Sequence, residues 1–438
     1  MQGEGGSNDP GPGRVRRAVR AVVSDVTPFR IYPRFRRLWL GEVVGGIGGE
    51  AIYVAILMQV YALTKSPAAL GIVGLVGFLP LMVGTSIGGP IIDRYDRRTI
   101  LTVGAAAHAA VTGVLLFNAL ASQPSLLVVY VGTGLLAFVS GIDVPARQAT
   151  TPVIVEKEHL QAAISLNNVM WSLSSIAGPF LGGLIIGTLG LSWTYALGAA
   201  AWLLTIAFVW RLGSIPPAEG AAEMSGWESL KEGLSFLKDK SVIKGTFAID
   251  LFAMIFGLPE ALFPVLAVTR FGEATAVANP DVITGGPVVG ALLASVAFGA
   301  LIASLTTGWT LRVKHQGQAV VWMVILWGAA ITVFGFSMQL WLACLLLAVA
   351  GGADTISAVF RGTILQNSLT DEMRGRITSI HFFVVAGGPR LGNLESGLVA
   401  QWTSPAFAII SGGMLCIAGA IGVALRNKPF WSYHADGT

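Results

Sequence analysis

Long apolar runs recur along nearly the whole chain, and each is long enough to cross a lipid bilayer. A bilayer core is about 30 Å thick and needs about 20 apolar residues in a helix to span it. The composition agrees, because 54% of the 438 residues are apolar, 12% are charged and the mean hydropathy is +0.70. The runs do not alternate as strands do, and backbone in lipid must satisfy its own hydrogen bonds. The sequence therefore predicts an all-α integral membrane protein.

Twelve of these runs are predicted to be transmembrane helices, since charged or turn residues bound each of them. They lie at approximately 38–63, 68–92, 100–120, 125–146, 160–188, 193–212, 243–270, 287–311, 318–338, 340–362, 376–401 and 405–426. The predicted domains are a cytoplasmic basic tail at 1–33, a six-helix half at 34–212, a cytoplasmic linker at 213–242, a second six-helix half at 243–426 and a cytoplasmic tail at 427–438.

The linker is predicted to contain a surface helix, because apolar residues recur with helical spacing from Trp227 to Leu237 and charged residues lie between them. In the first tail, Arg14–Val23 predicts either a short basic helix on anionic lipid or an unstructured segment. No secretory signal peptide is recognised there, so the first predicted helix is expected to direct membrane insertion.

The basic residues predict the orientation of the helices. With a cytoplasmic N-terminus, 25 of the 28 Lys and Arg residues fall in cytoplasmic segments. Only Lys65 and Arg270 fall in outside loops, and Arg390 lies within a predicted helix. Basic residues concentrate on the cytoplasmic side of membrane proteins, so both termini are predicted to be cytoplasmic, in a multi-pass protein of the cell membrane. This placement explains the basic excess without nucleic acid.

The sequence offers little that indicates an enzyme, because the one match to a nucleophile-elbow pattern, Gly84–Gly88, lies inside a predicted membrane helix. Cys344 and Cys416 both lie in apolar runs, without the spacing of a metal site or a disulfide framework. Nucleotide-binding and zinc-protease motifs are also missing. We therefore expect no enzymatic activity, no metal and no cofactor, in a protein that is a monomer.

One loop after the second predicted helix carries a recognisable motif. It reads Gly89-Pro-Ile-Ile-Asp93-Arg94-Tyr-Asp96-Arg97-Arg98. This resembles the signature loop of the major facilitator superfamily, in which glycine is commonest where Asp96 stands. The resemblance implies a cytoplasmic gate in which Asp93 pairs with an arginine on a neighbouring helix, for which Arg147 is the candidate. The expected gate residues are Gly89, Asp93, Arg94, Arg97, Arg98 and Arg147.

The two halves of the chain also resemble each other. The segment Asp143–Ser165 is echoed by Asp354–Ser379, and the pair Gly178-Pro179 is echoed by Gly388-Pro389. Such a duplication, with a binding site between the halves, is an architecture of secondary transporters. The sequence therefore predicts a substrate site at the interface of the halves.

The fifth predicted helix carries Gly178, Pro179, Gly182 and Gly183, which are similar to the glycine-proline motif of antiporters in this superfamily. Small residues at this spacing equally suit the close packing of any membrane helices. Three further segments, Phe35–Trp39, Asp250–Pro264 and Gly387–Asn393, resemble the enterobactin-exporter-like drug:proton antiporters of bacteria. One departure is that Val128–Gly132 lacks the mid-helix arginine found in many proton antiporters.

Six ionisable residues are predicted to lie within the membrane: Glu50, Asp250, Glu260, Asp354, Arg390 and Glu395. A charge there costs about 3 kcal/mol or more, so each is a candidate for proton coupling or for the substrate cavity. Glu50 is the first choice for proton coupling. Arg390 is expected to pair with Glu395 or Asp354, or to bind an anionic substrate. Buried structural ion pairs are the alternative interpretation of Glu50, Asp354, Arg390 and Glu395.

These features predict a transporter that works by alternating access. The leading hypothesis is export of a small amphipathic molecule, a drug-like compound or a siderophore, in exchange for protons. The alternatives are an uptake or facilitative carrier for a nutrient and a membrane receptor that does not transport.

Overall fold

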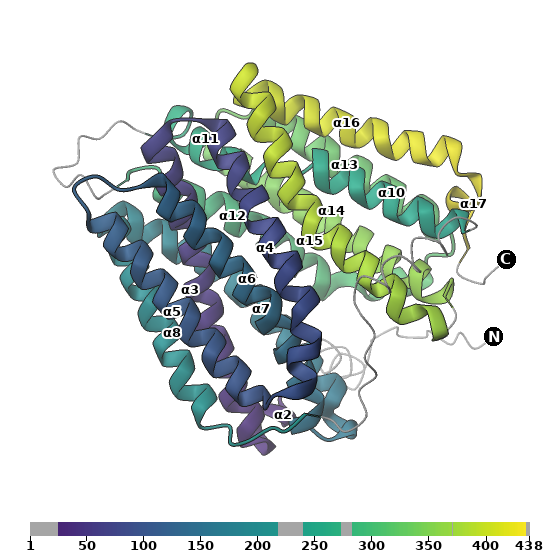
Figure 1. Cartoon of the computed structure of the whole chain (residues 1–438). Helices are drawn as coiled ribbons and strands as arrows, with labels where there is room; N and C mark the ends of the chain where they lie inside the picture. The colour runs from purple at the N-terminus through teal and green to yellow at the C-terminus, as the bar shows by residue number, and fades with distance from the viewer. Residues whose placement is uncertain (1–24, 218–239, 273–282, 370, 435–438) are drawn as a thin grey trace, which may run out of the picture.

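All elements of the computed structural model are helices within the residues that it describes, which are 25–217, 240–272, 283–369 and 371–434 (Figure 1). The first half consists of α2 (Thr27–Ile31), α3 (Pro33–Thr64), α4 (Pro67–Arg94), α5 (Arg97–Leu120), α6 (Leu126–Ile154), α7 (Lys157–Thr188) and α8 (Leu191–Trp210). The second consists of α10 (Ser241–Phe256), η2 (Glu260–Leu262), α11 (Phe263–Thr269), α12 (Gly286–Thr306), η3 (Thr307–Arg312), α13 (Gln316–Phe336), α14 (Leu340–Asn367), α15 (Asp371–Trp402), α16 (Pro405–Arg426) and α17 (Lys428–Trp431).

Eleven helical segments in the described ranges are long and apolar enough to cross a membrane, where twelve were predicted. They match the predicted runs in order, and α10 to α11 together form the seventh. The remaining predicted run, 376–401, lies within α15, a helix of 32 residues. The predicted surface helix at Trp227–Leu237 and the predicted tail helix at Arg14–Val23 lie outside the described residues.

Local sequence explains where these helices begin. The Ser66 hydroxyl accepts a hydrogen bond from the backbone N–H of Ala69 at the start of α4. Ser404 caps α16 in the same way, and proline occupies the first turn of α3, α4, α12 and α16. Such caps satisfy backbone groups that have no partner within the helix, and proline has no N–H to satisfy there.

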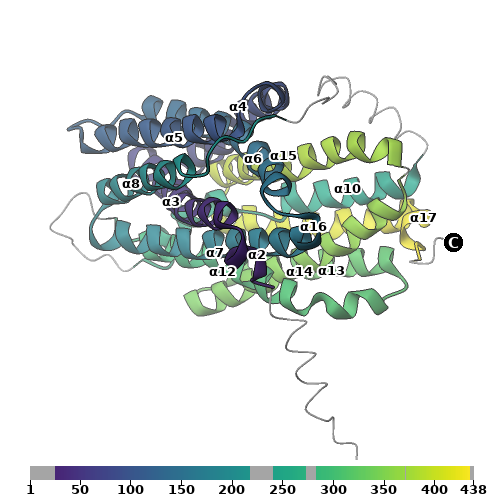
Figure 2. The same cartoon turned by 90° about the horizontal axis from the view of Figure 1, so that it is seen from below.

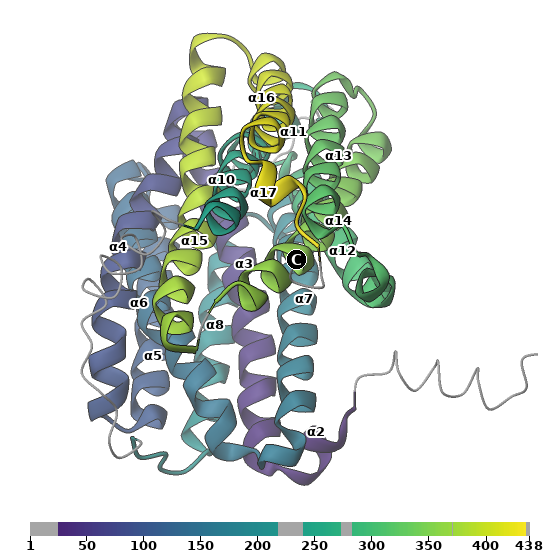
Figure 3. The ribbon, with the colours of Figure 1, turned by 90° about the vertical axis from the view of Figure 1, so that its right-hand side faces the viewer.

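The helices form two bundles, one from each half of the chain. In the first, α3 packs against α7 and α8, as the view in Figure 2 shows. In the second, α13 packs against α14 and α16. The bundles meet where α4 lies beside α15 and α7 lies beside α12 (Figures 1 and 3). The interface therefore joins helices that are far apart in the sequence.

The two bundles touch near one end of the molecule. We call the end that carries the loop 93–98 the basic end, and the other the opposite end. Contact between the halves is concentrated toward the opposite end, where the Ser66 hydroxyl donates a hydrogen bond of 2.7 Å to the Gln401 side chain. From there α4 and α15 diverge toward the basic end (Figure 1).

The seventh span is broken in the middle. Helix α10 ends at Phe256, and the backbone is not helical again until Glu260. The freed carbonyl of Gly257 accepts a hydrogen bond of 2.8 Å from the Trp327 indole, and the backbone N–H of Ala261 donates one of 3.0 Å to the Asn393 side chain. Irregular backbone at membrane depth is tolerated where protein groups satisfy it or where it lines a cavity. The break places Glu260 at the interface of the halves.

Candidate functional site

The glycine-proline motif lies on the faces of α7 that contact α3 and α12. A Cβ at Gly178 would lie 2.4 Å from Cβ of Glu50, and one at Gly182 would lie 2.7 Å from Cα of Ala51. Gly183 faces the other half, where an added Cβ would lie 2.3 Å from the carbonyl oxygen of Gly286. The motif therefore allows α7 to pack closely on α3 and, across the interface, on α12. Both interpretations of the motif, close packing and a role in transport, fit this position.

Glycines also bring α4 and α15 together. A Cβ at Gly74 would lie 2.6 Å from the carbonyl oxygen of Arg390, and one at Gly397 would lie 2.6 Å from that of Pro67. Contacts with backbone cannot be relieved by a change of rotamer. Because all these residues lie in the parts of α4 and α15 nearest the opposite end, the glycines close that end of the interface in this conformation.

Three of the predicted intramembrane residues meet between the halves. Glu50 on α3 and Glu260 at the break of the seventh span are close enough to interact electrostatically, and Arg390 on α15 interacts with Glu260. Tyr53, one turn after Glu50, interacts electrostatically with all three, and the Asn393 side chain accepts a hydrogen bond of 3.0 Å from the backbone N–H of Ala261, next to Glu260. We call Glu50, Tyr53, Glu260, Arg390 and Asn393 the interface cluster. It contains two carboxylates and one guanidinium from three different spans.

Asp250 and Asp354 belong to a separate group inside the second half. Nη2 of Arg361 lies 3.0 Å from Oδ1 of Asp250 and 3.2 Å from Oδ1 of Asp354. Asp250 on α10 and Arg361 on α14 are buried, whereas the side chain of Asp354 is 30% exposed. We call these residues the C-half triad.

The first half contains a counterpart, the N-half triad of Glu42, Asp143 and Arg147. Nη2 of Arg147 lies 3.2 Å from Oδ2 of Asp143, and its Nε lies 4.0 Å from Oε1 of Glu42. Glu42 and Asp250 are both nine residues after the start of their helices, so the internal duplication extends to the two triads.

The predicted pairing of Asp93 with Arg147 is not seen in this conformation. The acids that reach Arg147 are Asp143 and Glu42, and Asp93 is exposed at the end of α4. The reason is position, because Arg147 lies almost two turns inside α6 and points to α3.

The other gate residues are divided between surface and interior. Gly89 and Arg94 are exposed, and the Arg98 guanidinium lies 4.4 Å from the centre of the Trp210 ring. Arg97 is buried, and within the described residues its Nε and Nη1 have no hydrogen-bond partner. Its backbone N–H donates a hydrogen bond of 3.0 Å to the carbonyl of Ile215. The loop thus lies against the start of the linker.

Asp96, which departs from the superfamily motif, holds the start of that linker by hydrogen bonds. One carboxylate oxygen accepts a hydrogen bond of 3.2 Å from the N–H of Thr99 and caps α5. The other accepts hydrogen bonds from the Ser214 hydroxyl and from the N–H of Ile215, the latter at 2.8 Å. Partial burial raises the pKa of Asp96, but these hydrogen bonds outweigh it, and the net shift is downward.

We expect Asp96→Ala to lower the free energy of unfolding by about 0.5–2 kcal/mol, the usual range for a lost helix cap. Asp96→Asn is the control, because asparagine also caps helices. Since the folded pKa is lowered, the contribution of Asp96 is present above the ordinary value of 3.8 and is lost as the pH falls through the folded value. Melting curves at several pH values measure both effects, and equal stability of the alanine variant and the parent would contradict this role.

The structure corrects two expectations about intramembrane charges. Arg390 does not pair with Asp354, because Asp354 is held by Arg361 on its own helix. Arg390 and Glu395 are five residues apart, which places them on different faces of α15, and the acid that interacts with Arg390 is Glu260. Glu395 is partly buried.

The sequence analysis did not identify Arg361 as a site residue. Its side chain is among the most buried charged side chains that the structure describes. It was placed at the edge of the tenth predicted run and not treated as intramembrane. A signal was present, because Arg361 follows Asp354 by seven residues and so lies two turns away on the same face of a helix. The spacing of three residues between Glu50 and Tyr53 likewise indicated a shared face.

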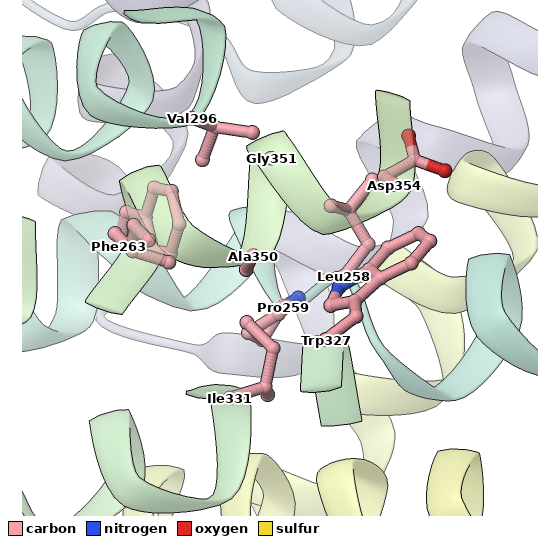
Figure 4. Close-up of a pocket in the computed structure, with 10 residues that line it drawn as sticks. Leu258, Pro259, Phe263, Val296, Trp327, Ile331, Ala350, Gly351 and Asp354 are labelled. Carbon is pink, nitrogen blue, oxygen red and sulfur yellow. The ribbon is translucent and has the colours of Figure 1, made fainter. Parts of the chain in front are cut away.

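A small cavity lies beside the break in the seventh span (Figure 4). Its ten lining residues are Leu258, Pro259, Phe263, Val296, Trp327, Ile331, Leu347, Ala350, Gly351 and Asp354, of which only Asp354 is charged. The cavity has a volume of about 20 Å³, and one water needs roughly 10–15 Å³. The cavity therefore has room for about one water and is too small for an organic substrate.

Comparisons with known proteins identify the family. The family model described as "Transmembrane secretion effector" matches residues 23–435. The enterobactin exporter EntS of Citrobacter koseri is 28% identical over 401 residues, which cover 91% of this chain and 93% of that protein. The protein of the same name from Escherichia coli O1:K1 is 27% identical over 394 residues, which cover 90% and 91%.

Solved structures agree on the fold. A crystal structure of the nucleoside transporter NupG matches with a TM-score of 0.68 at 14% identity, covering 91% of this chain and 98% of that one. A POT family transporter in complex with 5-aminolevulinic acid matches with a TM-score of 0.70 at 11% identity, covering 90% and 96%. With its helical architecture and the match over most of its length, this chain belongs to the transmembrane secretion effector family and is a transporter of the major facilitator superfamily.

Proposed function

We propose that this protein exports a small amphipathic molecule from the cytoplasm by alternating access and admits protons in exchange. The observation that carries the proposal is the interface cluster. Two carboxylates and one guanidinium, Glu50, Glu260 and Arg390, lie where the two halves meet. A charged group at membrane depth is costly, and one that faces each side in turn is what proton coupling requires. Glu50 remains the first candidate for the coupling residue.

The basic residues support the placement of the protein in the membrane. We propose that α15 is the twelfth span and that both termini lie in the cytoplasm, with the protein in the inner membrane. The basic end is then the cytoplasmic end. Since the halves touch near the opposite end, we propose that the conformation described here is the one that faces the cytoplasm and accepts a molecule for export. The same scaffold would also serve uptake, so direction must be measured.

The names of the relatives support the choice of substrate class. Both are enterobactin exporters, and enterobactin is a siderophore. We propose siderophores or drug-like amphipathic compounds as substrates, carried by the protein as a monomer, without a cofactor and without nucleic acid.

The test is transport into inverted membrane vesicles with an imposed pH gradient. Enterobactin and the dye ethidium represent the two substrate classes. We expect accumulation that requires the gradient and collapses when a protonophore is added. Accumulation that ignores the gradient would contradict proton antiport. Cells without the gene that lose growth on a nutrient, and do not become sensitive to a toxic compound, would contradict export.

The gate loop gives a second prediction. Asp93 is exposed in the conformation that is open toward the basic end, and we propose that it finds its partner only when that end closes. Asp93→Asn should then slow transport several-fold without changing the melting temperature. The reason is that the lost pairing would form only in the conformation in which the basic end is closed. Glu156→Gln, at an exposed acid before α7, is the control. Equal transport rates in both variants would remove Asp93 from the gate.

A further inference from the structure

The C-half triad has more negative than positive charge in a buried place. Its two carboxylates approach the same nitrogen of Arg361, at 3.0 Å for Asp250 and 3.2 Å for Asp354. Asp250 is 1% exposed and Arg361 is 3% exposed. The remaining terminal nitrogen of Arg361 donates a hydrogen bond of 2.8 Å to the Ser357 hydroxyl. One guanidinium therefore lies between two acids, of which Asp250 is fully buried and Asp354 is partly exposed.

Hydrogen bonding in the triad is incomplete. Among the described residues, Nε of Arg361 has no acceptor, and Oδ1 of Asp250 has an ion pair but no aligned hydrogen bond. The neighbouring helices bring two other titratable groups, His381 on α15 and Cys416 on α16, which interact electrostatically with Arg361. The Cys416 thiol itself makes a long contact of 3.8 Å with the carbonyl of Val324. Neither of these residues is a second permanent cation.

The charge balance of the C-half triad determines its protonation state. An ion pair in a low-dielectric interior repays its desolvation only when the charges balance, and two carboxylates that share one site cannot both remain ionised at little cost. One added proton converts one carboxylate to a carboxylic acid, leaves a single ion pair with Arg361 and makes the triad neutral. We propose that the C-half triad is a protonation site that holds one proton in this conformation, distinct from the interface cluster.

The structure also gives the proton a route. The Asp354 side chain is 30% exposed, and it lies at the edge of the small cavity in Figure 4. The exposed part of this side chain allows a proton to arrive without any movement of a helix. The N-half triad differs, because Arg147 contacts its two acids through different nitrogens, at 3.2 Å and 4.0 Å. Its carboxylates do not converge on a single atom as those of the C-half triad do.

Infrared spectroscopy of the purified full-length protein tests the proposal, because a protonated carboxyl has a C=O band that a carboxylate lacks. We expect the parent to have one such band that disappears in Asp354→Asn and also in Asp250→Asn. Either change leaves one acid for one arginine, so no proton is needed. Glu158→Gln, at an exposed acid on α7, should keep the band. An unchanged carboxylic acid band in both asparagine variants would overturn the proposal.

A second measurement does not depend on assigning the band. The parent should lose thermal stability as the pH rises and the proton is released, whereas Asp354→Asn, which stays neutral, should lose less. Identical pH profiles would count against the site.

Only the use of this proton in transport rests on the proposed function. If the parent shows no transport driven by a pH gradient, proton antiport fails while the band remains. If transport is driven but the band is unaffected, the triad fails alone.

Discussion

Replacing Gly183 by leucine should lower transport by roughly ten- to a hundredfold. A Cβ at this position would lie 2.3 Å from the carbonyl oxygen of Gly286 and 3.0 Å from Cα of Gly290, both on α12 in the other half. Backbone cannot give way as a flexible side chain can, so the two halves must move apart near the opposite end. Overpacking of this kind costs about 1–3 kcal/mol, and each 1.4 kcal/mol is about a tenfold change in population.

Gly183→Leu should disfavour the conformation in which the halves touch near the opposite end, and it should not affect folding. Gly183 lies at the contact between the halves, so each bundle keeps its own packing. Gly113→Leu on α5 is the matched control, because an added Cβ there has nothing within 4 Å. The measurements are substrate transport into inverted vesicles and the melting temperature of the purified variants. Full transport by Gly183→Leu would show that this contact does not form during the cycle.

Glu50→Gln should abolish transport driven by a pH gradient while the protein stays folded. Glutamine has nearly the same size and can still make hydrogen bonds in the interface cluster, but it cannot bind and release a proton. Exchange of labelled for unlabelled substrate without a gradient requires no net proton movement, so we expect it to continue in this variant. The two assays on the same vesicles separate the loss of coupling from the loss of binding.

Each possible result of the Glu50→Gln experiment has a distinct interpretation. If Glu50→Gln still accumulates substrate when a pH gradient is imposed, Glu50 has no part in coupling and Glu260 becomes the carboxylate of the interface cluster to examine. If exchange is lost as well, Glu50 contributes to the substrate site itself. Gln59→Leu is not a suitable control, because the Gln59 side chain accepts a buried hydrogen bond of 2.8 Å from Tyr195. Glu158→Gln changes the same functional group on the surface and is the better one.

The fold was largely predictable because its signals are local. A run of about 20 apolar residues specifies a membrane helix by length and composition alone. The start of α4 at Pro67 and the start of α16 at Pro405 fall within one residue of the predicted runs for the same reason, since proline and serine mark them. The break at Gly257 was not predicted. The apolar run continues through it, and only its partners on α13 and α15 make it stable.

The sequence indicates candidate residues but not their partners. The cost of a charge in lipid identified Glu50, Asp250, Glu260 and Asp354 from their positions in the apolar runs. It did not divide them into an interface cluster and a triad, because membership depends on which helices are neighbours. The pairing of Arg147 shows the same limit, since Glu42 lies 105 residues earlier in the chain and on a different helix.

By itself, the sequence determined that the chain spans the membrane many times, that it is duplicated, and that acids lie within its apolar runs. These properties depend on local hydrophobicity and on repeated spacing, which can be read residue by residue. The tertiary structure decided that Arg361 binds two acids, that Gly183 seals an interface and that Asp96 holds the linker. Each of these depends on contacts between segments distant in the chain, and close packing fixes such contacts only after the helices have assembled.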